Sequence, residues 1–359
     1  MVHRTVIPRQ AARTLTALLA LASVTVATSC SSGHRRAVAA SSPAAAPTTS
    51  PSPKPKPKPK PKPPATNPLT GLPGTPTGPV IAVKIDNTRP AQPQLGLESA
   101  DVVYVELVEA GLTRLIAVFA SQHPTTVGPV RSVRDTDPEV LGGYGKPALA
   151  FSGGAGGPKA TLHRSPLIDA SVDRFPATYR RLTTRYAPYN LVTNLQQLAA
   201  ALPTAARVKD VGFRFALRDA RLVRAKPVNL VNVVIGQTTL TFRWDAASHR
   251  WLRLAANGTV MHTASGAPVS TPNLVIERCP VRPDPADVDV NGVVSQYTST
   301  VGHGAALELR DGRVLTGTWQ RASASAPTRY LDAAGKDLLL RPGGAWVLLA
   351  PVTNQITYG

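Results

Sequence analysis

The chain has 359 residues and a formal net charge of +19. Residues 1–64 contain ten basic residues and no acidic ones, so the remaining thirty Lys and Arg and all twenty-one Asp and Glu give residues 65–359 a charge of +9. Two cysteines are too few for a disulfide framework or a cysteine-based metal cluster. No nucleic-acid recognition motif occurs, and nucleic acid is not expected as a partner.

Residues 1–30 have the three parts of an export signal. Three arginines precede an apolar run over residues 15–26, which is too short for a permanent membrane span. The run ends in A-T-S-C, and small residues before Cys30 resemble the lipobox of bacterial lipoproteins, although Ala27 stands where Leu is usual. We therefore expect Cys30 to carry a diacylglyceryl group and acyl chains such as palmitate, on the extracytoplasmic face of the cell membrane. The alternative is ordinary cleavage and a soluble secreted product.

Residues 31–66 are rich in Ala, Ser, Thr and Pro and include a Lys-Pro alternation. Proline favours polyproline II and like-charged lysines repel, so we expect a proline-rich, disordered linker that extends about 40 Å over residues 51–64. The linker is interpreted as a spacer, and the alternative is that its lysines bind cell-wall polyanions.

The first globular portion, residues 67–210, has a mixed pattern. Runs at 79–87, 101–108, 113–119 and 147–152 predict strands. In the first run, period two puts Lys84 and Asp86 on one face and Val83 and Ile85 on the other. Because burying either charge alone is costly, each must find a partner, reach a cavity or lie on an open face.

Turn and helix signals lie between these strands. Residues 109–111 predict a tight hairpin turn, and residues 135–138 have the composition of a helix start. The stretch 153–159, G-G-A-G-G-P-K, is interpreted as a loop because of its proline, although its amides would suit an anion. A capping box of Thr193 with Gln196 predicts a helix over residues 193–202.

The second portion, residues 215–359, reads as short alternating strands separated by turn signals. Asp311-Gly312 between A-L-E-L-R and R-V-L-T-G-T-W is the clearest hairpin. Cys279 is expected as a lone buried thiol in a strand. The predicted fold class is α+β, with a mixed α/β N-terminal half followed by a β-rich barrel- or sandwich-like half.

Several long motifs occur in a fixed order: A-V-K-I-D-N-T-R-P, A-D-V-V-Y-V-E-L-V-E-A-G-L-T-R, V-G-P-V-R-S-V-R, and later G-H-G-A-A-L-E-L-R-D-G and R-P-G-G-A-W-V-L-L-A-P. Together they resemble the YerB-like lipoprotein family, a domain of unknown function, across residues 67–355. This resemblance implies export and a two-part architecture but no activity. The chain departs from the family pattern at Val105, where relatives usually have an acid.

Charged residues gather at the expected strand ends and hairpin tip of the first portion. As candidate ligand-binding residues for carboxylate or phosphate we identify Lys84, Asp86, Asn87, Arg89, Arg114, Arg131, Arg134 and Asp135. The candidate catalytic carboxylates are Asp86 with Glu106 or Glu109. The alternative is a structural ion-pair network. The histidines have no metal-ligand spacing, and neither a metal nor a cofactor is expected.

Aromatic residues of the second portion raise a further possibility. Trp319, Trp346, Tyr297 and His303 suit a carbohydrate or peptide groove, and we favour core packing for the tryptophans.

Three functions remain open from the sequence. The first is binding or scaffolding at the cell envelope, with an anionic cell-wall polymer or an envelope protein as partner. The second is an envelope hydrolase or transferase, which requires two of the candidate carboxylates to face each other across an open cleft. The third is a partner-binding module, which requires a flat, exposed apolar patch.

Overall fold

The computed structural model describes residues 65–202 and 204–359. The expected signal peptide, Cys30 and the Lys-Pro linker lie outside these residues. Within them, no helix has the length and apolar character that crossing a membrane requires.

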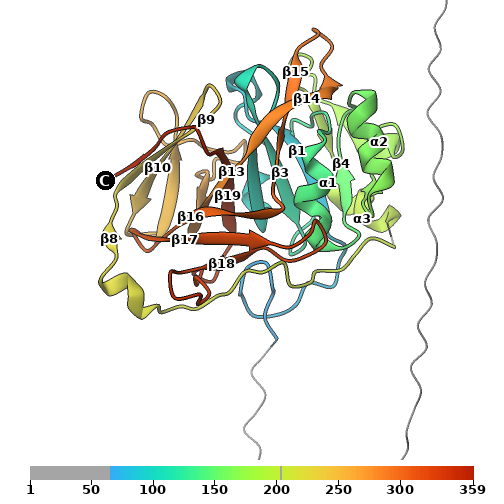
Figure 1. Ribbon diagram of the computed structural model, residues 1–359. Coiled ribbons are helices and arrows are strands. Elements are labelled where there is room, and N and C mark those ends of the chain that lie inside the picture. Colours follow the sequence, from blue (N-terminus) through green and yellow to red (C-terminus); the bar gives the residue numbers. More distant parts are fainter. Residues whose placement is uncertain (1–64, 203) are drawn as a thin grey trace, which may run out of the picture. The chain divides into compact units, whose positions relative to one another are not determined.

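A mixed sheet of eleven strands forms the centre of the described part (Figure 1). In order across the sheet the strands are β18 (Arg329–Leu331), β17 (Arg313–Arg321), β16 (Gly302–Arg310), β13 (Asn273–Cys279), β19 (Ala345–Pro351), β2 (Val102–Leu107), β3 (Thr113–Phe119), β1 (Ile81–Asp86), β4 (Ala148–Ala150) and β5 (Ile168–Asp169), and β8 (Lys226–Pro227) pairs with β17. Strand β19 is parallel to both of its neighbours, β2 and β13. The portions expected at 67–210 and 215–359 therefore share one sheet.

Smaller sheets complete the strand inventory. One contains β12 (Ser270–Thr271), β11 (Arg250–Leu254), β10 (Thr238–Asp245), β9 (Leu230–Ile235) and β20 (Ile356–Tyr358), and two hairpins are formed by β14 (Val281–Val288) with β15 (Val294–Thr298) and by β6 (Tyr179–Arg181) with β7 (Leu191–Thr193). In Figure 1, β9 and β10 lie to the left of the large sheet, and the α-helices lie over and beside its right-hand part.

Helices are few and short. They are α1 (Thr136–Leu141), α2 (Gly156–Arg164) and α3 (Leu195–Ala201), with 3-10 turns η1 (Arg89–Ala91), η2 (Leu97–Ser99), η3 (Glu109–Gly111), η4 (Gly142–Tyr144), η5 (Pro176–Thr178) and η6 (Ala220–Val223).

Two hydrophobic cores lie on opposite faces of the large sheet. Val83 and Ile85 of β1 belong to one core, together with Phe242 and Trp251 of the five-stranded sheet. Ala82 belongs to the other, with side chains of α1 and α2. The alternation predicted for β1 is thus confirmed, and removal of this apolar surface from water stabilises both layers at about 25 cal/mol per Å². The predicted α+β class is confirmed, and its β-rich half packs as a sandwich.

The predicted helix starts need two corrections. Helix α3 begins at Leu195, where Asn194 caps it by accepting a hydrogen bond from the Gln197 amide at 3.1 Å. The predicted capping residue, Thr193, instead ends β7, where its backbone pairs with Tyr179. The stretch expected to be a loop around Pro158 begins helix α2. Proline is tolerated there because amides in the first helical turn have no intrahelical acceptor.

The predicted hairpin at Asp311-Gly312 joins β16 to β17. Both residues have positive φ, 50° and 67°, as a two-residue type I′ turn requires. A Cβ on Gly312 would also lie 2.8 Å from the indole ring of Trp244, which is too close for a real contact.

We predict that Gly312→Ala lowers the free energy of unfolding by about 2–3 kcal/mol, because positive φ and the contact with Trp244 both oppose the methyl group. Gly258→Ala is the matched control, since Gly258 has φ 80° but nothing within 4 Å of an added Cβ. Urea denaturation should show a loss of only about 1 kcal/mol for the control. If both variants lost the same free energy of unfolding, the contact with Trp244 would not contribute to the cost of Gly312→Ala.

Candidate functional site

The predicted charged residues of the first three strands lie on one face of the large sheet. Strand register puts Asp86, Arg114 and Glu106 in a row across β1, β3 and β2, and Lys84 occupies the next row of β1. None of these side chains is more than 8 % exposed. This face is the one that helix α1 covers.

Lys84 joins two strands to α1. Its ammonium group forms ion pairs with Glu106 and, at 2.5 Å, with Asp137 in the first turn of α1. The second oxygen of Asp137 accepts a hydrogen bond from the Arg134 amide at 2.9 Å. Burial lowers the pKa of Lys84 to about 8, and Asp137 opposes that shift, so the ammonium remains predominantly charged at neutral pH.

Glu109 at the hairpin turn is the centre of a second group. It pairs with Arg114, and it accepts hydrogen bonds from Arg134 Nε at 2.8 Å and Nη2 at 2.5 Å. Burial alone would raise the pKa of Glu109, but the two arginines hold it below its usual value. Arg134 Nε also lies 3.3 Å from Asp287 of β14. The hairpin turn, the start of α1 and β14 are therefore linked by charge.

Asp86 has its own cation, Arg131, whose Nε lies 2.8 Å from Asp86 Oδ2. Its other oxygen accepts a hydrogen bond from the Thr88 amide at 2.7 Å. The Arg131 side chain is 23 % exposed and lies over the ring of Tyr189. Lys84 and Asp86 thus find separate partners and do not pair with each other.

The candidate catalytic carboxylates occupy no open cleft. Asp86, Glu106 and Glu109 are each at most 4 % exposed, and each forms an ion pair with a lysine or arginine. A buried carboxylate that is held in an ion pair is a poor general acid or base. This arrangement favours an ion-pair network that holds the strands and α1 together.

Two predicted residues lie apart from this network. Arg89 is exposed. Asn87 is buried between the portions: its amide donates to Thr113 Oγ1 at 2.8 Å, and its carbonyl oxygen accepts from Arg253 Nη1 at 2.8 Å. Sequence reasoning missed Arg253. The available signal was period two in R-W-L-R-L, which puts Arg253 on the inward face with Trp251.

Asp135 has a different environment. Its Oδ1 atom is buried and has no hydrogen-bond partner among the described residues, and the same holds for Asp284 Oδ2 of β14. Burial raises the pKa of Asp135, and the neighbouring Asp284 carboxyl group adds to the rise.

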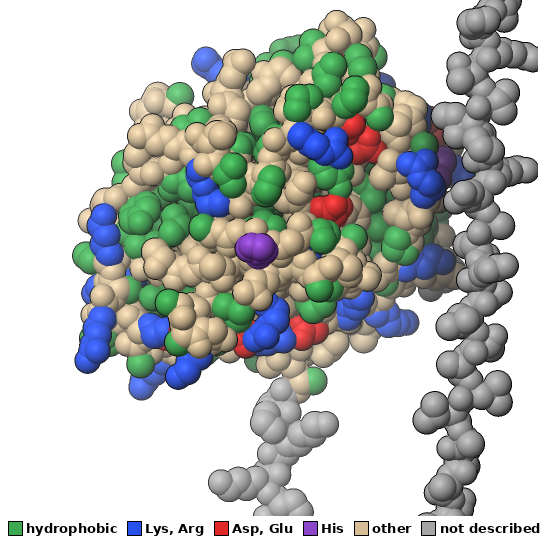
Figure 2. Space-filling view, viewed as in Figure 1, with side chains coloured by type: hydrophobic (Ala, Val, Ile, Leu, Met, Phe, Trp, Pro, Cys, Tyr) green, Lys and Arg blue, Asp and Glu red, His purple; other side chains and the backbone are tan. Residues whose placement is uncertain are grey.

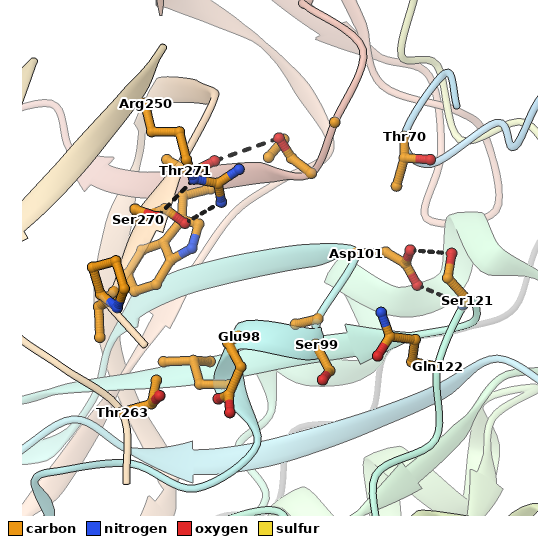
Figure 3. Close-up of a pocket in the computed structure, with 18 of the residues that line it drawn as sticks. Thr70, Glu98, Ser99, Asp101, Ser121, Gln122, Arg250, Thr263, Ser270 and Thr271 are labelled. Carbon is orange, nitrogen blue, oxygen red and sulfur yellow. Dashed lines mark hydrogen bonds between the residues drawn. The ribbon is translucent and has the colours of Figure 1, made fainter. Parts of the chain in front are cut away.

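A cavity of about 250 Å³ lies beside the η2 turn (Figure 3). On one side Asp101 accepts hydrogen bonds from the amides of Ala120 and Ser121 and from the Ser121 hydroxyl. On the other side Arg250 donates to Ser270 Oγ at 2.7 Å and to its carbonyl at 2.8 Å. The charged groups of this cavity are therefore already bonded to the protein.

The aromatic groove considered from the sequence is not formed. Trp319 and Trp346 are 0 % and 5 % exposed and lie in the cores, while Tyr297 donates to Glu139 and His303 is exposed. Cys279 is buried in β13, as predicted, and burial raises the pKa of its thiol. In residues 65–202 and 204–359, no group of three or more His, Cys, Asp or Glu side chains is arranged to hold a metal ion.

Lys84→Met should lower the free energy of unfolding by about 3–5 kcal/mol, because it leaves Glu106 and Asp137 buried without a cation. Lys159→Met is the control, since the Lys159 side chain is 40 % exposed and lies 3.8 Å from Asp173, and its loss should stay below about 1 kcal/mol. Denaturant titration measures both. A Lys84→Met protein as stable as its parent would show that the network does not hold the fold.

Asp284→Asn tests the carboxyl pair through its pH dependence. The pKa of Asp135 is raised in the folded state, so protonated Asp135 contributes stability at low pH. This contribution is lost as the pH rises through the raised pKa. The variant should therefore melt about 2 °C higher than the parent at pH 7, because it removes the carboxyl group that raises the pKa of Asp135. The difference should shrink at pH 3.5. A constant difference across this range, or one matching exposed Asp173→Asn, would exclude coupling.

Comparison with known proteins identifies the chain's relatives. It is 26 % identical over 300 residues to "Putative lipoprotein YerB" of Bacillus subtilis (strain 168), covering 79 % of this chain and 86 % of the relative. The crystal structure of Bacillus subtilis YerB has a TM-score of 0.67 to this structure at 22 % identity, over 82 % of this chain and 99 % of that one. That likeness shows a shared fold.

Sequence models of one family match both portions. The N-terminal domain of the protein of unknown function DUF3048 matches residues 69–209, and the C-terminal domain of the same family matches residues 231–347. The resemblance read from the motifs is confirmed, and the chain belongs to the DUF3048 family, with both of its domains present in order.

Proposed function

We propose that the protein is a lipid-anchored binding protein of the cell envelope, tethered through Cys30, that recognises an anionic ligand outside the membrane. The tether is supported by the lipobox-like residues before Cys30 and by the similarity to the Bacillus subtilis protein named "Putative lipoprotein YerB". A single lipid-modified residue followed by a long linker suits a protein that works near a membrane surface.

One observation favours binding over catalysis. Every candidate catalytic carboxylate is buried and paired with a cation, so none is free to exchange a proton with a substrate. The hydrolase or transferase alternative therefore has no carboxylate pair of the expected kind.

The charge balance supports an anionic ligand. Residues 65–359 carry +9, and Figure 2 shows basic side chains dispersed over the visible face with few acidic ones among them. A dispersed positive field attracts anions over a distance without fixing their position. Specific recognition then requires a defined site.

The partner-binding alternative requires a flat apolar patch. Of the exposed large apolar side chains among the described residues, four, Val288, Val290, Val293 and Val294, lie on the β14–β15 hairpin, and the others lie on other segments. The four valines form one hairpin tip and not a flat face built from several elements, so ligand binding is favoured.

Metabolic labelling with an alkyne analogue of palmitate, followed by membrane fractionation, tests the tether on the full chain. The parent protein should be labelled and membrane-associated. Cys30→Ala should lose the label and leave the membrane fraction, whereas Cys279→Ala should keep both properties, because Cys279 is buried in a strand. A labelled Cys30→Ala protein, or an unlabelled parent, would exclude the tether.

A further inference from the structure

A cavity of about 490 Å³ lies where the two portions of the chain meet. Residues after β1 and at the start of β3 form one wall, and the β9–β10 turn and the end of β11 form the other. Its volume falls within the range of small-molecule sites, roughly 300–1,000 Å³. It is therefore large enough for an organic ligand and larger than a bare oxyanion requires.

Arg253 lines this cavity and is only 4 % exposed. Its guanidinium donates to Asn87 Oδ1 and lies over the ring of Trp346. Its Nε atom is buried without a hydrogen-bond partner, and it forms no ion pair with any described residue. Burial lowers its pKa to about 10, and no carboxylate opposes this shift.

Each other buried arginine among the described residues has either an ion pair or, in Arg321, hydrogen-bond acceptors for all three guanidinium nitrogens. Arg310 pairs with Asp311 and donates to three backbone carbonyl oxygens, and Arg134 pairs with Glu109. A buried charge without a counter-charge is costly, and folded proteins nearly always provide one. Arg253 differs from these arginines in that it lines a cavity and has no carboxylate partner among the described residues, so a ligand in the cavity can supply the counter-charge.

The remaining lining suits a ligand with both a charged and an apolar part. Thr88 Oγ1 is a second buried polar atom without a partner, and Arg89 adds an exposed positive charge. Leu254 and Met261 supply apolar surface. A guanidinium matches the planar oxygen pairs of carboxylates and phosphates, with which it forms charge-assisted hydrogen bonds.

We propose that this cavity binds a small organic anion, with Arg253 as the buried counter-charge of its carboxylate or phosphate group and Arg89 as a second cation at the edge. This site deepens the proposed function, on which it rests, by naming the place and chemical class of the ligand. It uses Asn87 and Arg89 from the predicted set, while the ion-pair network only holds that edge of the sheet in position.

Isothermal titration calorimetry of the detergent-solubilised full chain tests the site with four probes: inorganic phosphate, phenyl phosphate, acetate and benzoate. The two aromatic probes should bind more tightly than their small counterparts, because the cavity offers apolar surface. Comparison of the phosphate pair with the carboxylate pair identifies which group is preferred. Arg253→Gln should weaken binding of the best probe at least about tenfold, as expected for charge-assisted hydrogen bonds.

Arg250→Gln is the matched control. It lies on the same strand, but its guanidinium is bonded to Ser270 and lines the other cavity, so binding should be unchanged. Arg89→Glu changes only an exposed side chain and should also weaken binding, which keeps the test valid if Arg253→Gln does not fold. The site would be overturned if Arg253→Gln or Arg89→Glu bound the best probe as tightly as the parent protein does. It would also be overturned if the parent protein bound none of the four probes. Neither outcome bears on palmitate labelling at Cys30, so failure of this site and failure of the proposed lipid tether can be told apart.

Discussion

The arrangement of the first portion depends on one buried ammonium group. Lys84 has no access to water, so it requires carboxylates, and it obtains them from β2 and from α1. This requirement fixes the height of α1 above the sheet and the register between the first strands. The position of α1 sets the position of Arg134, which lies just before the helix. The ion pair between Arg134 and Glu109 then orients the hairpin turn. The residues directly after β1, among them Asn87, are thereby placed against β11.

Contacts between the two sequence portions are part of one architecture. In the large sheet the strands of the second portion lie on one side and those of the first portion on the other, and the two groups meet where β19 pairs with β2. The cavity at Arg253 also has walls from both portions. A ligand held there would touch residues that are far apart in the chain, and its binding energy would add to the stability of the whole described unit. The positions that sequence comparison assigns to two domains thus behave as one physical body.

Much of the fold was predictable because it follows from local rules. Period-two alternation located β1, and Asp311-Gly312 located the β16–β17 turn. The charged residues were identified, but their partners were not, because pairing depends on which strands are neighbours and where α1 lies. Arg253 was missed for the same reason. The sequence of an apolar strand does not show whether an arginine within it will have a carboxylate partner in the folded protein. The start of helix α2 around Pro158 was missed because proline was taken as a sign of a loop. Proline is tolerated in the first turn of a helix, and Pro158 lies in that turn.

Strand β19 has a consequence for the order in which the protein is made. The ribosome completes β2 long before it reaches residues 345–351, yet β2 and β13 each need β19 as a parallel neighbour. Until then both strands expose an open hydrogen-bonding edge, which is a template for aggregation. Contacts so distant in sequence also form slowly. A chain shortened by its last fifteen residues would lose the middle of its sheet, so nascent and truncated forms should depend on chaperones more than the length of the missing segment suggests.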